Sequence, residues 1–83
     1  MPCFIAKIEV WLKEGLVDAE GKAITEALND LRYPIIDVSV GKIYKLLINA
    51  ADEEHAYKIV DEICKRLLTN PVKDRYSFTV KTT

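Results

Sequence analysis

The sequence predicts an α+β domain in which two helices cover one face of a four-stranded antiparallel sheet. Three observations support this fold class. Segments with the period of two that is typical of strands lie at residues 3–13 and 76–80. Two further segments, 35–40 and 43–50, are rich in branched apolar residues. Between these strands lie two segments with the apolar spacing of amphipathic helices, so the order is strand, helix, strand, strand, helix, strand. These elements account for residues 1 to 81, and no segment remains that could form a lid or a catalytic loop.

The size and charge of the chain limit its possible functions. We expect a single domain over residues 1–83, and a domain of this size buries only about 60% of the surface of its unfolded chain. Its 12 basic and 13 acidic residues nearly cancel, which favours neither nucleic acid nor an anionic membrane as a partner. A thin core and a balanced charge indicate a soluble module that gains stability from a partner or from a second copy.

The first strand and the first helix have clear boundaries. Along residues 3–13, alternate apolar positions define an inward face made of Ala6, Ile8, Val10 and Leu12. Asp18 is placed to cap a helix, because its carboxylate can accept hydrogen bonds from the free amides of the first turn. Pro34 is expected to end that helix, since the residue before a proline avoids the helical region.

The middle of the chain is predicted to form a hairpin. Ile35–Val40 and Ile43–Ala50 are separated only by Gly41 and Lys42, which is the length of a tight turn. Val-Gly-Lys is a weaker turn signal than Asn-Gly, so a bulge is the alternative.

The second helix is the clearest element of the sequence. It is predicted from Asp52 through Leu68, with one apolar stripe and an opposite face of acid-first pairs four residues apart, Glu54 with Lys58, Asp61 with Lys65, and Glu62 with Arg66. Asn70 and Pro71 then break the chain before the last strand. The resulting order is the ferredoxin-like one, in which right-handed crossovers place both helices on the same face of the sheet.

The uncovered face of the predicted sheet is the candidate surface for self-association. Ile5 and Trp11 point outward there, beside Lys7 and Glu9. A mixed apolar and charged sheet face that carries a tryptophan is typical of a subunit interface.

Residues that could perform chemistry do not form a recognisable site in the sequence. His55 is the only histidine and no second ligand stands at a metal-binding spacing, while Cys64 lies in the apolar stripe of the second helix. Cys3 and Cys64 have no CxxC spacing, which favours reduced thiols and a cytoplasmic protein. Gly41-Lys42 lacks the remainder of a phosphate-binding loop. We therefore expect no catalytic residue, no metal site and no cofactor bound by this chain.

Several other proteins of this fold class carry motifs that are missing here. An RNA-recognition domain needs a central aromatic consensus, a metallochaperone needs a paired-cysteine loop, and an acylphosphatase-like enzyme needs an arginine after the first strand. The loop after the first strand reads Lys13-Glu14-Gly15-Leu16 instead.

A set of short motifs, in their order and spacing, resembles the PurS family, the small subunit of phosphoribosylformylglycinamidine synthase. The resemblance runs over nearly the whole chain and rests on Leu12-Lys13, Asp18-Ala19-Glu20-Gly21, Ala23-Ile24, Ala27-Leu28, Val40-Gly41-Lys42, Cys64, Leu67-Leu68, Asn70-Pro71-Val72 and Tyr76. Three positions depart from the family pattern. Arg32 stands where a helix-ending glycine is common, Ser39 where a basic residue is common, and Arg75 where an acid is common.

The resemblance implies a non-catalytic adaptor that forms a homodimer or a tetramer. Such a subunit joins a glutaminase subunit to a synthetase subunit and supports the transfer of ammonia between them in purine biosynthesis, with ATP and magnesium on the synthetase subunit. The family pattern also makes Lys42, Asn70, Pro71 and Tyr76 candidate contacts with these larger subunits. The main alternative is a stand-alone regulatory module that binds a small ligand between two copies, as ACT-like domains do. A minimal enzyme of the same fold class is a third hypothesis.

Overall fold

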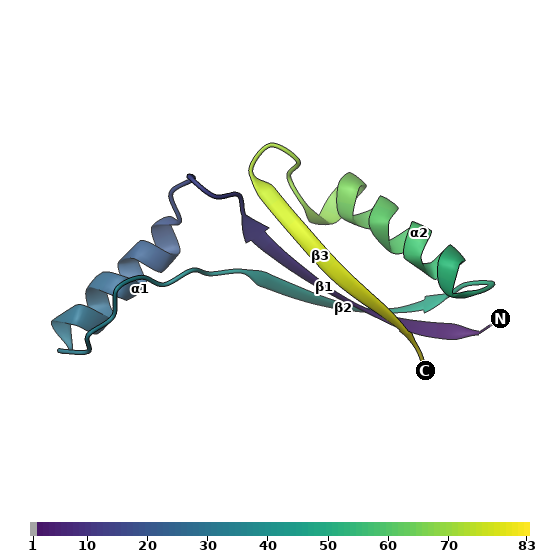
Figure 1. Ribbon diagram of the computed structural model, residues 1–83, viewed down its shortest axis with the longest axis horizontal. Coiled ribbons are helices and arrows are strands. Elements are labelled where there is room, and N and C mark those ends of the chain that lie inside the picture. Colours follow the sequence, from purple (N-terminus) through teal and green to yellow (C-terminus); the bar gives the residue numbers. More distant parts are fainter. Residues whose placement is uncertain (1) are drawn as a thin grey trace.

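The computed structural model describes residues 2–83, which form three strands, two α-helices and one π-helical turn (Figure 1). In chain order these elements are β1 (Cys3–Leu12), α1 (Ala19–Asp30), β2 (Lys42–Asn49), α2 (Glu53–Ile63), the π-helical turn η1 (Cys64–Leu68) and β3 (Asp74–Thr82). Within these residues, no helix has the length and apolar character needed to cross a membrane.

The core of the domain lies between β1 and α2. β1 is the central strand of an antiparallel sheet in the order β2-β1-β3, and α2 lies over β1 and β3. The alternation predicted for β1 is confirmed for Ala6, Ile8 and Val10, which are buried, whereas Leu12 at the end of the strand is half-buried. The three buried residues pack with Val60 and Cys64 from α2 and its continuation.

The predicted four-stranded sheet is wrong. Among residues 2–83 the sheet has three strands, because residues 35–40 form no strand and the chain runs from this segment directly into β2. A tight hairpin of the favoured type needs a positive φ at its first central residue, and the positive φ values in the described chain belong to Gly15 and Arg32, not to Gly41. The amide of Val40 donates instead to the carboxylate of Asp18.

The position of α1 also differs from the prediction. Figure 1 shows α1 beside the extended segment before β2 and away from the sheet, so the two helices do not share a sheet face. We call residues 16–40 the arm. Within residues 2–83, the buried apolar core includes no side chain from the arm. The Cα radius of gyration is 16.6 Å, whereas a compact chain of this length has about 12 Å.

Both ends of α1 are capped by local hydrogen bonds. Asp18 is the N-cap, as predicted, and its Oδ1 accepts from the amide of Gly21 at 2.8 Å. The C-terminal end comes earlier than the Pro34 signal predicted. The amides of Arg32 and Tyr33 donate back to the carbonyls of Asn29 and Leu28, the two bonds of a Schellman motif. Arg32 has φ 70°, in the left-handed region that this motif requires.

α2 follows its prediction closely. Asp52 caps it by accepting from the amide of His55 at 2.8 Å. The three acid-first pairs all form, with N–O distances of 3.5, 2.9 and 3.0 Å. The predicted helix ends at Leu68 in the structure too, although its last five residues form the wider π-helical turn. There the amide and the hydroxyl of Thr69 both donate to the carbonyl of Cys64.

Replacing Arg32 with glycine should stabilise the end of α1. A residue other than glycine in the left-handed region costs about 1–2 kcal/mol, part of which the greater freedom of glycine in the unfolded chain offsets. We expect a net gain of about 0.5–1 kcal/mol, measured by amide hydrogen exchange of residues 28–31 in Arg32→Gly. Replacing the exposed Asp30, which lies inside the helix, with glycine is the control and should speed exchange. Faster exchange in Arg32→Gly would contradict the assignment of strain to this position.

Candidate functional site at the base of the arm

Three parts of the chain meet at the base of the arm. Here β1 ends, α1 begins, and the chain returns from the arm into β2. Two hollows of about 320 and 270 Å³ lie side by side at this point, and both are lined by Trp11, Leu12, Asp18 and Val40.

Asp18 joins the two ends of the arm through one carboxylate. Its Oδ1 accepts from the Gly21 amide, and its Oδ2 accepts from the Val40 amide, each at 2.8 Å. These two backbone hydrogen bonds, that from Gly21 first, lower the pKa of Asp18 below its ordinary value. The side chain is therefore charged at neutral pH and bridges residues that are 22 positions apart.

Two glycines let the backbone pass close to its neighbours here. A Cβ atom at Gly21 would collide with the carbonyl oxygen of Val38, so the start of α1 lies directly against the extended segment. A Cβ at Gly41 would lie 2.7–2.8 Å from ring carbons of Trp11. Trp11 is half-buried, and its ring packs against the backbone of the same chain at Gly41, just before β2. Its role in self-association stays a prediction.

Lys42 and the turn before β3 lie at this same end of the molecule. Lys42 lines the smaller hollow together with Lys73 and Asp74. The structure thus places two of the predicted contact regions, Lys42 and the Asn70–Tyr76 segment, around one surface although they are far apart in the sequence.

The turn itself is held in shape by polar contacts. Lys13 donates from Nζ to the carbonyl of Pro71 at 2.7 Å and from its amide to the carbonyl of Lys73 at 2.8 Å. Asn70 accepts from the amide of Val72 through its side chain, while its own amide donates to the Asp74 carboxylate. Asn70 and Pro71 therefore sit in a fixed and exposed turn.

Tyr76 differs from the other candidate residues because its hydroxyl makes a hydrogen bond within the chain itself. The hydroxyl donates to Oδ1 of Asp61 at 2.7 Å, and Lys65 pairs with the other oxygen of that carboxylate. The hydrogen bond to Asp61 raises the pKa of Tyr76 to about 12. The contact joins β3 to α2.

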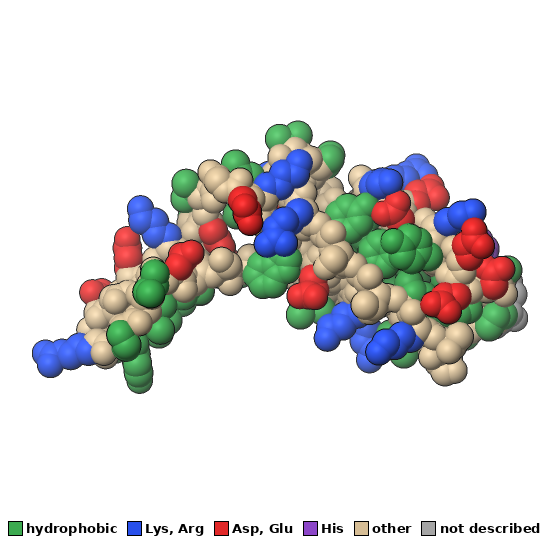
Figure 2. Space-filling model, in the orientation of Figure 1, with side chains coloured by type: hydrophobic (Ala, Val, Ile, Leu, Met, Phe, Trp, Pro, Cys, Tyr) green, Lys and Arg blue, Asp and Glu red, His purple; other side chains and the backbone are tan. Residues whose placement is uncertain are grey.

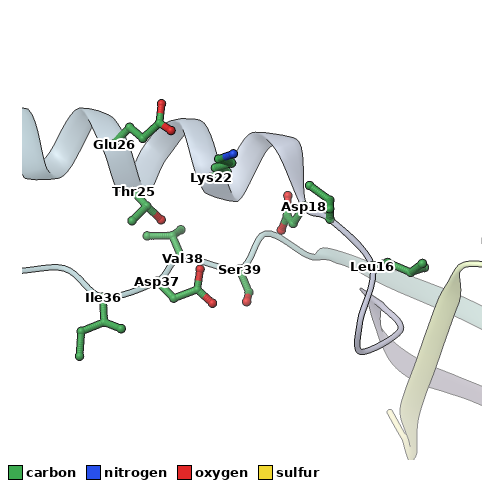
Figure 3. Close-up of a pocket in the computed structure, with 10 residues that line it drawn as sticks. Leu16, Asp18, Lys22, Thr25, Glu26, Ile36, Asp37, Val38 and Ser39 are labelled. Atoms are coloured by element: carbon green, nitrogen blue, oxygen red, sulfur yellow. The ribbon is translucent and has the colours of Figure 1, made fainter.

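The arm carries a groove of its own. About 450 Å³ in volume, it runs between α1 and the extended segment and is lined by apolar and charged side chains (Figure 3). In this view Thr25 and Val38 face one another across it, whereas Ile36 points away from α1. Ile36 is 97% exposed.

The uncovered face of the sheet contains Ile5, as predicted from the alternation. Ile5 is half-buried and stands opposite Leu47 on β2, which is 72% exposed. Lys7 and Lys45 form the next pair on this face, so charged side chains interrupt the apolar ones.

The remaining candidate residues have structural surroundings. Cys64 is buried, and burial together with the charge of Asp61 raises its thiol pKa. Cys3 donates from Sγ to Oδ1 of Asn49 at 3.1 Å. His55 is exposed, and its Nδ1 accepts from the amide of Ala51 at 3.0 Å. Across residues 2–83, no group of three or more His, Cys, Asp or Glu side chains is arranged to hold a metal ion.

Known proteins identify the family of this chain. The family model for PurS, described as phosphoribosylformylglycinamidine (FGAM) synthase, matches residues 5–82. The chain belongs to the PurS family. The PurS subunit of phosphoribosylformylglycinamidine synthase from Archaeoglobus fulgidus is 39% identical over 74 residues, which cover 88% of this chain and 92% of that protein. The corresponding subunit from Bacillus subtilis is 36% identical over 90% of this chain and 89% of its own length.

Solved structures of PurS proteins share the fold. PurS from Methanocaldococcus jannaschii, one of the subunits of formylglycinamide ribonucleotide amidotransferase in the purine biosynthetic pathway, is 33% identical with a TM-score of 0.86, and the match covers 96% of this chain and 98% of that one. A chain of the PurLQS structure from Thermotoga maritima matches over the full length of both chains with a TM-score of 0.87 and 32% identity. The likeness extends over the arm, since it covers the whole chain. Membership of this family favours the subunit hypothesis over the ACT-like module.

Removing the Tyr76 hydroxyl should change how stability depends on pH. A tyrosine pKa that folding raises from 10.0 to about 12 means that the folded state holds the proton more tightly. The stabilisation is present below pH 10 and is lost as the pH rises toward 12. The difference in unfolding free energy between the wild type and Tyr76→Phe should therefore shrink over this range in urea titrations at successive pH values. Tyr33→Phe, at an exposed tyrosine of the arm, is the control. A difference that stays constant from pH 10 to 12 would contradict the Tyr76–Asp61 coupling.

Proposed function

We propose that this chain is the non-catalytic adaptor subunit of a phosphoribosylformylglycinamidine synthase complex in purine biosynthesis. It joins a glutaminase subunit to a synthetase subunit and supports the passage of ammonia between them. ATP and magnesium act on the synthetase subunit in this scheme. The single observation that carries the proposal is the full-length match to a chain of the PurLQS assembly from Thermotoga maritima.

A physical argument explains why such a complex needs an adaptor. Ammonia that escapes into water at neutral pH is mostly protonated and is then no longer nucleophilic. Holding two active sites together and excluding water from the space between them preserves the reactive form. A subunit can do this with its surfaces alone, which fits a chain whose titratable side chains are mostly exposed and used in caps, turns and ion pairs.

Self-association is part of the proposal, and the arm is its main element. The arm leaves apolar side chains exposed, among them Val17 (80%), Leu31 (68%) and Ile36 (97%). α2 lies over β1 and β3, while the inward side chains of β2 are half-exposed, namely Tyr44, Leu46 and Ile48. The arm of a second copy supplies an apolar helix for this half of the sheet face. Figure 2 shows hydrophobic side chains along the arm, where the subunit itself provides no cover.

The other candidate contacts are assigned to separate surfaces. Ile5, with Leu47 opposite it, is proposed to meet a further copy, so that two dimers can form a tetramer. Trp11 is proposed to flank the place where the arm of each copy crosses to the sheet of the other. Lys42, Asn70 and Pro71 lie at one end of the sheet and are proposed to contact the larger subunits. Tyr76 supports this end from inside by tying β3 to α2.

The adaptor function predicts a selective dependence on glutamine. The amidation of formylglycinamide ribonucleotide by the glutaminase and synthetase subunits should require this protein when glutamine is the nitrogen source. The rate with free ammonium should change little, because free ammonia reaches the synthetase from solution. Both rates are measured with and without the protein, using partners whose separate activities are verified first. Equal dependence of the two rates, or no dependence of either, would refute the adaptor function.

Placing a charge on the arm should weaken the dimer. Ile36→Glu changes a side chain that is 97% exposed in the single subunit, so the subunit itself should still fold. If a second copy buries Ile36, the lost apolar burial of about 1.5–3 kcal/mol raises the dissociation constant at least about tenfold in sedimentation equilibrium. Val72→Glu, at an apolar residue outside the arm that is 81% exposed, is the matched control and should keep the dimer. An unchanged dissociation constant for Ile36→Glu would rule out the arm as the contact.

A further inference from the structure

We propose that Asp18 is a positioning residue whose carboxylate fixes the direction of the arm, so that each subunit already presents its arm outward before a second copy binds. The proposal rests on the self-association proposed above. It concerns a different property, namely what prevents the arm from folding back onto its own sheet.

The carboxylate of Asp18 acts on both ends of the arm at once. Oδ1 holds the first turn of α1 through the Gly21 amide, and Oδ2 holds the end of the extended segment through the Val40 amide, at 2.8 Å each. The arm therefore leaves the sheet and returns to it at one clamped point. The close approach of Gly21 to the carbonyl of Val38 extends this clamp along the arm.

The same hydrogen bond competes directly with a folded-back arm. In a tight hairpin through Gly41 and Lys42, the Val40 amide would pair with the carbonyl of Ile43. Here that amide is engaged by Asp18. Forming the hairpin would break this bond and move Gly41 away from its place over the Trp11 ring. The clamp thus favours the outward arm over the hairpin that the local sequence allows.

A fixed arm lowers the cost of association. A freely moving arm loses conformational freedom when a second copy orders it, and this loss subtracts from the binding free energy. Asp18 restricts the arm in the free subunit, so less freedom remains to be lost on binding.

The substitution Asp18→Asn separates the clamp from the helix cap. Asparagine is as good an N-cap as aspartate, and its one carbonyl oxygen can still accept from Gly21. Its second group is a donor and cannot accept from the Val40 amide. Asp37→Asn is the matched control, since it makes the same chemical change at an exposed aspartate of the arm.

The experiment combines amide exchange with dimer affinity in the full chain. For Asp18→Asn we expect the Val40 amide to exchange at least about tenfold faster while the helix signal in circular dichroism is kept, and the dimer dissociation constant to rise by about tenfold. Asp37→Asn should match the wild type in all three measurements.

Two results would overturn the proposal. One is wild-type protection of the Val40 amide in Asp18→Asn. The other is faster exchange of that amide with an unchanged dissociation constant, which would mean that the clamp exists but does not prepare the arm.

If the wild type does not dimerise, the self-association proposed above fails on its own. Small-angle scattering of the monomer then decides the role of Asp18, because an equal radius of gyration for the wild type and Asp18→Asn refutes it and a smaller one for the variant supports it.

Discussion

The packing of α2 against alternate residues of β1 is the interaction on which the rest of this subunit depends. Val60 and Cys64 meet Ala6, Ile8 and Val10 in the centre, and these side chains are almost fully buried. One helix of this length covers only part of a three-stranded sheet, so the inward side chains of β2 stay half-exposed. A domain of 83 residues has little further surface to bury within itself. The apolar side chains that remain are therefore available to other subunits.

The arm shows how a helix can persist outside a core. An isolated helix of 12 residues is only marginally stable in water. α1 gains from a capped N-terminus at Asp18, from the two carbonyl bonds of its Schellman motif, and from its contact with the extended segment at Gly21. These interactions are local or involve the arm alone. They can be satisfied before any partner is present, which is what a surface offered for association requires.

Local signals in the sequence predicted the elements well. The alternation of β1, the caps at Asp18 and Asp52 and the ion pairs of α2 depend on residues a few positions apart, and all are present. The hairpin prediction was wrong because an extended backbone at residues 35–40 does not determine the direction of the chain after it. That direction depends on Asp18 and Trp11, which are remote in sequence. For the same reason, the sequence indicated Lys42 and the turn at Asn70 as separate candidates but could not predict that both lie at the same end of the sheet. The hydrogen bond between Tyr76 and Asp61 was also not predicted, because no periodic pattern connects the two residues.

The charge of the subunit bears on how it would find its partners. Net charge −1 gives little long-range attraction, so association would depend on short-range contacts and on shape. At the base of the arm, both basic and acidic side chains line the two hollows, which suits a specific partner surface better than a uniformly charged one. For the proposed ammonia transfer this matters, because excluding water requires surfaces that fit closely. A turn that hydrogen bonds hold in shape, next to an arm whose two ends are joined by Asp18, meets that requirement better than two mobile elements.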